Sequence, residues 1–201
     1  RRYPHRRDAP CAKAPAAPVP LLWKVSDKDN AVYLLGSFHL LRQSDYPLSA
    51  DVENAFADAE RLMFELAPEE MQSTTVHQLM LRAALRTDGK TLQQDLDPAT
   101  WKRLEPWAGK NAIPMVAFNS VEPWYVGLTI SIVEMTKQGL DPKLGLDNHF
   151  MDKAKAAGKP TAGLEIAQEQ IGVLDGMEAA EQRQFIVESL DQADKGSVGT
   201  E

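Results

Sequence analysis

Apolar and polar positions along the chain predict short strands that alternate with amphipathic helices. Apolar, β-prone runs at residues 21–25 and 31–35 enclose a polar turn and predict a hairpin. Two further strands are expected at 61–66 and 161–165, and the weak apolar run at 113–118 is a candidate for another. Apolar residues at helical spacing predict the remaining elements: helices that begin at Ser49 and that cover residues 71–86, 98–109, 121–138, 147–157, 167–175 and 178–193.

Strands that alternate with helices indicate an α/β fold, in which a mixed sheet with partly parallel strands is flanked by several helices. We expect this domain to occupy residues 21–201. The segment before it, at residues 8–20, contains four prolines and cannot form a regular helix or a ladder strand. Residues 1–20 are therefore expected to be a Pro/Ala-rich leader or linker.

Composition excludes several classes of protein. Hydrophobic residues make up 43% and charged residues 25% of the 201 positions, which is typical of a globular protein. The net charge of −7 speaks against nucleic acid as a partner, because phosphate binding needs clustered Lys and Arg. No run approaches the roughly 20 apolar residues of a transmembrane helix. The single cysteine, Cys11, excludes an intramolecular disulfide and a thiolate-rich zinc site, and we expect it to be incidental rather than lipidated.

Three polar residues at the ends of predicted strands, or shortly after them, are the candidates for chemistry: His39, Glu65 and Glu165. If the strands share a sheet and a direction, these side chains converge at one edge. An imidazole and two carboxylates suit a divalent ion such as Mn, Co or Zn, and a carboxylate not bound to the ion suits a general base. Taken singly, His39 also fits a hydrogen-bonded turn residue, and each glutamate fits a solvated residue beside the next helix.

Three other residues have weaker arguments. Gly36 lets the backbone approach a ligand or a neighbouring strand closely, and it permits a positive φ at the strand exit. Asp147 is expected to cap the helix that follows it. His149 lies in the first turn of that helix, where it either faces the same edge as His39 or is a surface histidine.

Three segments, which form two signatures, resemble a known family. The runs VYLLGSFHLL at 32–41 and YPLSADVENAFADAERLMFELA at 46–67 resemble the start of TraB/GumN-type proteins, which are relatives of the Tiki membrane proteases. The stretch GLDPKLGLDNHFMDKAKAAGKPTAGLEIAQEQIGVLDGM at 139–177 is similar to the second signature of the same family, in the same order. The resemblance covers about residues 21–193.

The resemblance implies an α/β fold related to erythromycin-esterase-like and ChaN-like domains. For Tiki-type members it also implies divalent-metal-dependent hydrolysis of a peptide or protein substrate by GxxH histidines and acidic residues. Gly36 and His39 match the first GxxH, Glu65 matches the acid after the next strand, and Glu165 matches the acid of the GKPxxGLE signature. Gln170 matches the EQ pair that follows, whereas Asp147 and His149 lie in the GLDxHF element without an assigned role.

The sequence departs from the family pattern in one respect. Family members commonly continue to a second GxxH near the C-terminus, and this chain has none. We therefore expect the sheet to be incomplete without a C-terminal portion, and the active site of a metal-dependent peptidase to be half present. The alternative is a non-catalytic binding or accessory module of the cell envelope or the exopolysaccharide system, and haem binding is a third option.

Two further expectations concern self-association and the location of the protein in the cell. A sheet that lacks strands exposes an unpaired edge and apolar surface, so we expect the chain to self-associate. The resemblance and the tether-like leader predict a periplasmic or other extracytoplasmic location.

Overall fold

The structure of the protein, a computed structural model, describes residues 21–198. The predicted leader at residues 1–20, with Cys11, lies outside the described residues. The described chain forms two compact units. The first contains residues 21–36 and 47–59, and the second contains residues 37–46 and 60–198.

The first unit is a hairpin with one helix. Strands β1 (Leu22–Ser26) and β2 (Ala31–Leu35) pair antiparallel, which confirms the predicted hairpin. Asp27 shapes the turn, because its Oδ1 accepts the backbone N–H of Asn30 at 2.8 Å. Helix α1 (Ala50–Asp58) follows Ser49, as predicted.

The two faces of this hairpin differ. On one face Tyr33 donates its hydroxyl to Asp58 of α1 at 2.6 Å, and the Lys24 ammonium lies 4.9 Å from the centre of the Tyr33 ring. The other face is apolar and open, since four residues that pair across it are each more than half exposed: Trp23 with Leu34, and Val25 with Val32.

The second unit contains the other two strands. β3 (Leu62–Leu66) and β4 (Thr161–Glu165) pair in parallel, and helix α8 (Leu146–Ala157) precedes β4. The predicted α/β class is therefore confirmed. The described strands form two separate sheets, so β2 does not join β3 and β4. A short turn makes β1 the nearest partner for β2, whereas β3 and β4 meet only after a long helical connection.

Most of the remaining helices lie close to their predicted positions. The predicted helix at 71–86 forms as α3, which begins later because Ser73 is its N-cap and accepts the N–H of Thr75 at 3.1 Å, and the short helix α2 before it was not predicted. The bounds of the elements not yet given are α2 (Pro68–Met71), α3 (Thr74–Ala84), α4 (Leu92–Asp95), α5 (Pro98–Lys110), α6 (Met115–Phe118), α7 (Pro123–Lys137), α9 (Ala167–Asp175) and α10 (Ala179–Val198), with short 3-10 turns at η1 (Gln43–Asp45) and η2 (Pro142–Leu144).

One predicted strand is wrong. The apolar run at 113–118 forms helix α6 instead of a strand. Pro114 is its N-cap residue, and a proline without a backbone N–H suits a helix start better than a strand ladder. Across the described residues, none of the helices has both the length and the apolar character to cross a membrane.

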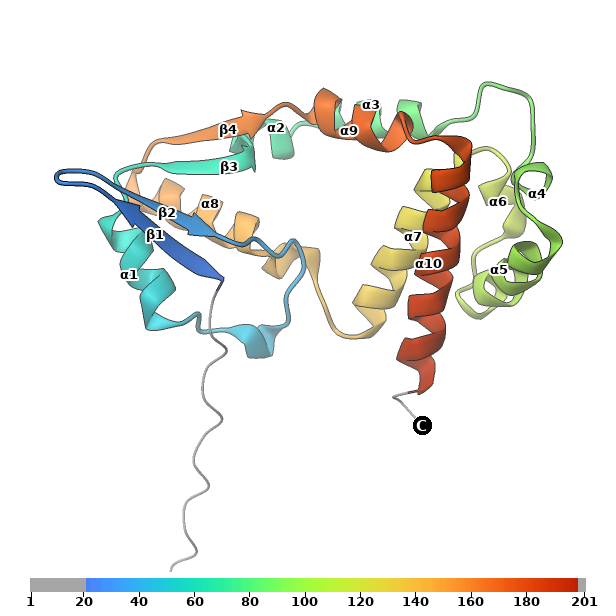
Figure 1. The fold of residues 1–201 in the computed structure, drawn as a ribbon, viewed down its shortest axis with the longest axis horizontal. Helices are drawn as coiled ribbons and strands as arrows, with labels where there is room; N and C mark the ends of the chain where they lie inside the picture. The colour runs from blue at the N-terminus through green and yellow to red at the C-terminus, as the bar shows by residue number, and fades with distance from the viewer. Residues whose placement is uncertain (1–20, 199–201) are drawn as a thin grey trace, which may run out of the picture. The chain divides into compact units, whose positions relative to one another are not determined.

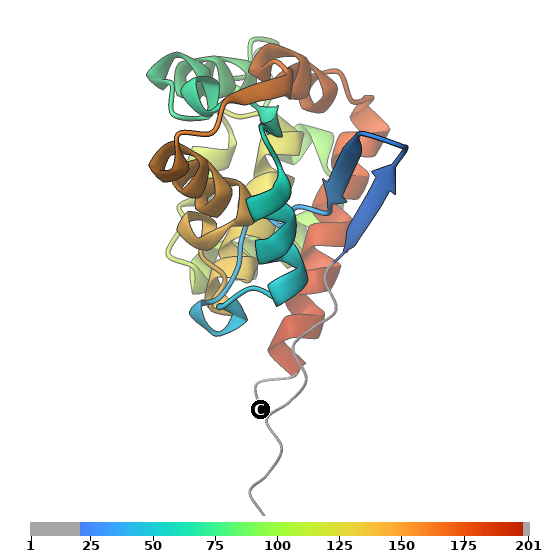
Figure 2. The ribbon, with the colours of Figure 1, turned by 90° about the vertical axis from the view of Figure 1, so that its left-hand side faces the viewer.

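Helices α7 and α10 form a parallel pair that runs side by side in the second unit (Figure 1). The backbone N–H of Trp124 donates to Oε1 of Gln182 at 3.2 Å, and the hydroxyls of Ser131 and Ser189 are 3.0 Å apart. Both contacts join residues 58 positions apart, so the two helices run in the same direction. Helices α3 and α9 form a second neighbouring pair (Figures 1 and 2).

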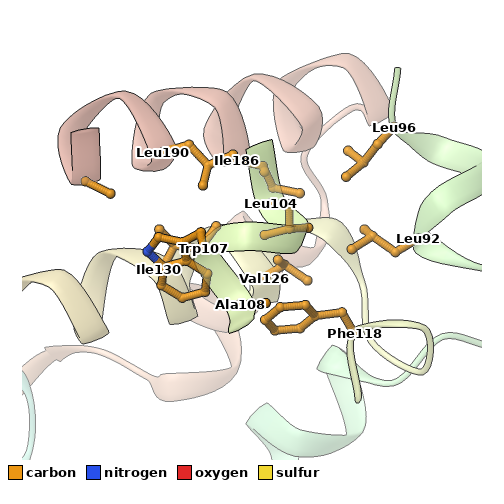
Figure 3. Close-up of a cluster of buried hydrophobic side chains, with 11 residues drawn as sticks. Leu92, Leu96, Leu104, Trp107, Ala108, Phe118, Val126, Ile130, Ile186 and Leu190 are labelled. Carbon is orange, nitrogen blue, oxygen red and sulfur yellow. The ribbon is translucent and has the colours of Figure 1, made fainter. Parts of the chain in front are cut away.

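The core of the second unit gathers around α5, α7 and α10 (Figure 3). Leu104, Ile130 and Ile186 are fully buried there, one from each of these helices. Leu92 in α4, Leu96 at the C-terminal end of α4, and Phe118 in α6 extend this apolar cluster. The burial of these large side chains accounts for the stability of the helical part of the unit.

Replacing Gly127 with alanine is expected to destabilise the α7–α10 pair. A Cβ at Gly127 would lie 2.8 Å from the ring of Phe185, so the helices must separate or the ring must move. We expect the free energy of unfolding to fall by about 1–3 kcal/mol in urea denaturation. Gly109→Ala is the matched control, because open space surrounds that helical position and the change should be neutral or stabilising. Equal stability of the two variants would contradict this packing.

Candidate functional site

The segment that carries His39 is held against the start of α8. We call residues 37–46 the docked loop. Leu41 and Asp141 pair through two backbone hydrogen bonds of 2.8 and 3.3 Å, in an antiparallel bridge. Three more hydrogen bonds fasten the loop: Leu146 N–H to Phe38 O at 2.9 Å, Arg42 Nε to Gln138 O at 2.9 Å, and Tyr46 hydroxyl to Leu144 O at 2.6 Å. The two sequence signatures that are far apart along the chain therefore meet here.

Gly145 allows this close approach. A Cβ at this position would overlap the carbonyl oxygen of His39. The backbone of Gly145 has φ −59° and ψ 151°, which other residues adopt, so the requirement for glycine is steric. His39 consequently lies directly against the N-terminus of α8.

Asp147 is the centre of the hydrogen bonding at this point. Its Oδ2 accepts the hydroxyl of Ser37 at 2.7 Å and lies 2.9 Å from Nδ1 of His39. Asp147 is only 8% exposed. The expected capping role of Asp147 is wrong, because the N-cap of α8 is Gly145 and Asp147 is the second residue of the helix. Its carboxylate turns toward the docked loop instead.

The hydrogen bond between His39 and Asp147 shifts the pKa values of both side chains. It raises the pKa of His39, against partial burial that lowers it, and the nearby charges of Asp147 and Glu65 add to the increase. The same hydrogen bond lowers the pKa of Asp147, and the Ser37 hydroxyl adds to this effect. Asp147 is therefore an ionised acceptor under ordinary conditions.

These shifts predict a pH dependence of stability. The raised pKa of His39 gives a stabilisation that is fully present below its unfolded pKa and is lost as the pH rises through the folded pKa. The lowered pKa of Asp147 gives a stabilisation that is present above its unfolded pKa and is lost as the pH falls through the folded value. The His39–Asp147 pair therefore contributes most to the stability of the fold at a pH between the ordinary pKa values of aspartate and histidine.

Urea unfolding of the chain and of His39→Gln checks this dependence. The difference between them should be largest at about pH 5, between the ordinary pKa values of aspartate and histidine, and should shrink as the pH rises through the raised pKa of His39. A difference that does not change between these conditions would contradict a charged pair.

Glu65 faces the second nitrogen of His39. Its Oε2 lies 3.7 Å from His39 Nε2, and the side chains of His39 and Glu65 are 62% and 52% exposed. The two ring nitrogens of His39 thus meet different carboxylates, a buried one at Nδ1 and an exposed one at Nε2. We call Ser37, His39, Glu65 and Asp147 the His39 cluster.

Glu165 takes a different position from Glu65. It pairs with Leu66 in the β3–β4 register, so the alternation of strand side chains directs it to the face opposite Glu65. Its Oε2 accepts a hydrogen bond from the amide of Gln170 at 3.1 Å. The structure therefore joins two predicted residues, Glu165 and Gln170, but outside the His39 cluster.

Gly36 and His149 have packing roles in the structure. The Gly36 N–H donates to Leu21 O at 2.8 Å, and a Cβ on Gly36 would lie 3.0 Å from the Leu21 side chain. Of the two predicted reasons for this glycine, the close approach to a neighbouring strand applies, and its φ is not positive. The His149 ring lies 5.0 Å from the rings of both Tyr46 and Phe150.

Sequence reasoning missed three residues of this region. The Ser37 hydroxyl donates to Asp147, and Gly145 permits the close approach of the docked loop to α8. Glu70 accepts the backbone N–H of Ala167 at 2.9 Å, at the start of the helix that follows β4. A signal existed for Ser37 and Gly145, since each lies inside a quoted signature, in GSFH and in GLDNHF. Glu70 gave no signal, because its partner is a backbone group.

The donor set fits part of a divalent-metal site. Imidazole and carboxylate are suitable ligands, and a histidine that binds a metal through one nitrogen usually donates the other N–H to a carboxylate, as His39 can to Asp147. Within residues 21–198, however, no group of three or more His, Cys, Asp or Glu side chains is arranged to hold a metal ion. His39 and Glu65, 3.7 Å apart, therefore do not make a complete metal site by themselves.

Comparison with known proteins identifies the family. A model of the TraB/PrgY/gumN family matches residues 21–200, which includes the whole His39 cluster and Glu165. No individual curated protein and no solved structure matches the chain. The family match extends over both signatures that meet at the docked loop. This chain therefore belongs to the TraB/PrgY/gumN family.

Proposed function

We propose that this chain carries the His39–Glu65 half of a divalent-metal-dependent hydrolase site that acts on peptides. The observation that supports it best is the arrangement of His39, whose Nδ1 is bound by the buried Asp147 while its Nε2 faces Glu65 at 3.7 Å. A carboxylate at one ring nitrogen is the usual partner of a histidine that binds a metal through its other nitrogen. Peptide as the substrate class follows from the resemblance to the Tiki-type proteases.

His39 and Glu65 would hold the ion, which we expect to be Mn, Co or Zn. When bound, such an ion polarises a carbonyl group and lowers the pKa of a bound water. His39 supplies a neutral nitrogen ligand, and Glu65 supplies negative charge that offsets the charge of the ion. Remaining ligands must come from outside this cluster, and Glu165 stays a candidate only if its side chain and strand end can turn toward His39.

Metal binding, followed by calorimetry, tests this proposal, because a half site can bind an ion without completing a catalytic site. Mn²⁺ or Co²⁺ is titrated into the chain, into His39→Ala and into the control His77→Ala, which changes an exposed histidine on α3. We expect binding by the parent and by His77→Ala, and a loss of affinity in His39→Ala at least as large as the roughly 10–100-fold typical for an outer-shell partner. Any cleavage of unstructured peptides in the presence of the ion should be lost in the same variant. Equal binding by all three would contradict the assignment of His39, and no binding by any of them would contradict the proposal and favour the non-catalytic binding module.

We also expect the chain to self-associate. The apolar face of the hairpin is open at Trp23 and Leu34, and on the β3–β4 sheet Leu164 is 70% exposed. Apolar patches of this kind are rare on soluble monomers. Light scattering should report a mass above that of one chain, with a decrease on Trp23→Ser, and a monodisperse monomer would contradict this expectation.

A further inference from the structure

The hydrogen bonds around Asp147 determine where the protons of the His39 cluster lie. One carboxylate oxygen, Oδ2, receives both Ser37 Oγ at 2.7 Å and His39 Nδ1 at 2.9 Å. An ionised carboxylate has only acceptors, so both partners must donate. Nδ1 of His39 therefore carries a proton, and in the neutral ring Nε2 carries a lone pair instead. Nε2 is the nitrogen that faces Glu65.

We propose that Asp147 and Ser37 are positioning residues that hold His39 in its Nδ1-protonated tautomer and direct the Nε2 lone pair toward Glu65. The inference deepens the proposed function, because only this tautomer offers Nε2 as a ligand on the exposed side. Ser37 acts through Asp147: its hydroxyl fixes the carboxylate that orients the ring. Neither residue touches a substrate in this account.

The backbone of the docked loop does not depend on these side chains. Leu41 pairs with Asp141, and Leu146 donates to Phe38, through main-chain groups alone. A change at the Asp147 carboxylate is therefore expected to alter the ring of His39 while the loop stays in place. An experiment can therefore distinguish a carboxylate that orients the His39 ring from one that holds the loop in place.

Long-range ¹H–¹⁵N NMR of ¹⁵N-histidine-labelled protein tests the inference at a pH where the imidazole is neutral. In the parent we expect the His39 proton on Nδ1. In Asp147→Asn the amide can donate to Nδ1, so the proton should move to Nε2. Asp141→Asn is the matched control, because that carboxylate accepts Lys143 N–H on the same segment and does not contact His39. The control should keep the parent tautomer.

Ser37→Ala provides a second variant if Asp147→Asn does not fold. It should show a partial shift toward Nε2–H, because the hydroxyl no longer fixes the orientation of the carboxylate toward Nδ1. A parent chain with its proton on Nε2, or an Asp147→Asn variant with an unchanged tautomer and a folded amide spectrum, would overturn the inference for Asp147. An unchanged tautomer in Ser37→Ala would overturn it for Ser37.

A metal titration adds a functional readout. Loss of a carboxylate that orients a ligand histidine typically costs 10–100-fold in metal affinity, and we expect about this loss of Mn²⁺ affinity in Asp147→Asn. The tautomer measurement needs neither metal nor substrate. A tautomer shift without any metal binding would therefore sink the proposed function alone, whereas metal binding that is unaffected by Asp147→Asn would sink the positioning role alone.

Discussion

Replacing Gly145 with alanine should force the docked loop away from α8 and break the hydrogen bond between His39 and Asp147. The new Cβ would overlap the carbonyl oxygen of His39, which is backbone and cannot rotate out of the way as a side chain can. Overpacking alone costs about 1–3 kcal/mol, and the hydrogen bonds of the loop would be strained as well. Urea denaturation measures the loss of stability, and the histidine NMR spectrum reports the displacement of the His39 ring.

Gly172→Ala is the control for this experiment. Gly172 lies in α9 with nothing within 4 Å of the position its Cβ would occupy, so the substitution should be neutral or slightly stabilising. If Gly145→Ala were as stable as the parent and kept the His39 spectrum, the close contact between the loop and α8 would be wrong.

Removal of the Arg86 guanidinium should be the most destabilising charge deletion in the second unit. The side chain is only 4% exposed, and its Nη2 lies 2.9 Å from Asp88 and 2.6 Å from Asp95. Arg86→Met leaves Asp95, whose side chain is 20% exposed, without its buried cation. We expect a loss of about 3 kcal/mol, the low end for broken buried pairs, because Asp88 remains accessible to water. Urea denaturation is the measurement.

Arg86→Lys separates charge from geometry. Lysine keeps the positive charge, but it cannot reach Asp88 with both Nε and Nη2 as arginine does. It should recover part of the loss seen with methionine. A methionine variant as stable as the parent would show that the buried pair contributes no net stability.

Periodicity was a good guide to the helices because each buries a continuous apolar stripe. Leu104 and Ile130 lie on such stripes, and α5 and α7 form within two residues of their predicted bounds. The run at 113–118 failed because its four helical residues are too few to show a period, so composition suggested a strand. The strands also divide into two small sheets, one antiparallel and one parallel, instead of one mixed sheet, and no local pattern in the sequence shows which distant strands pair.

The candidate site was predictable in part. His39, which comes after β2 in the sequence, and Glu65, which lies near the end of β3, are close together as expected, whereas Glu165 does not join them. Asp147 was assigned to capping, since a residue at a helix start usually contacts its own helix, whereas here Gly145 brings another segment close enough to take over the carboxylate. The position of Glu165 depends on the register of β4 against β3, and a shift of one residue changes its face.

Paramagnetic broadening by Mn²⁺ tests the central claim most directly, because it shows which histidine is next to the ion. Small amounts of Mn²⁺ are added to ¹⁵N-histidine-labelled protein, and the ring signals of His39, His77 and His149 are followed. We expect the His39 signal to broaden first, and we expect Glu65→Gln to remove this preference. If the three rings broaden together, or if Glu65→Gln leaves the preference unchanged, His39 and Glu65 do not form the metal-binding half of the site.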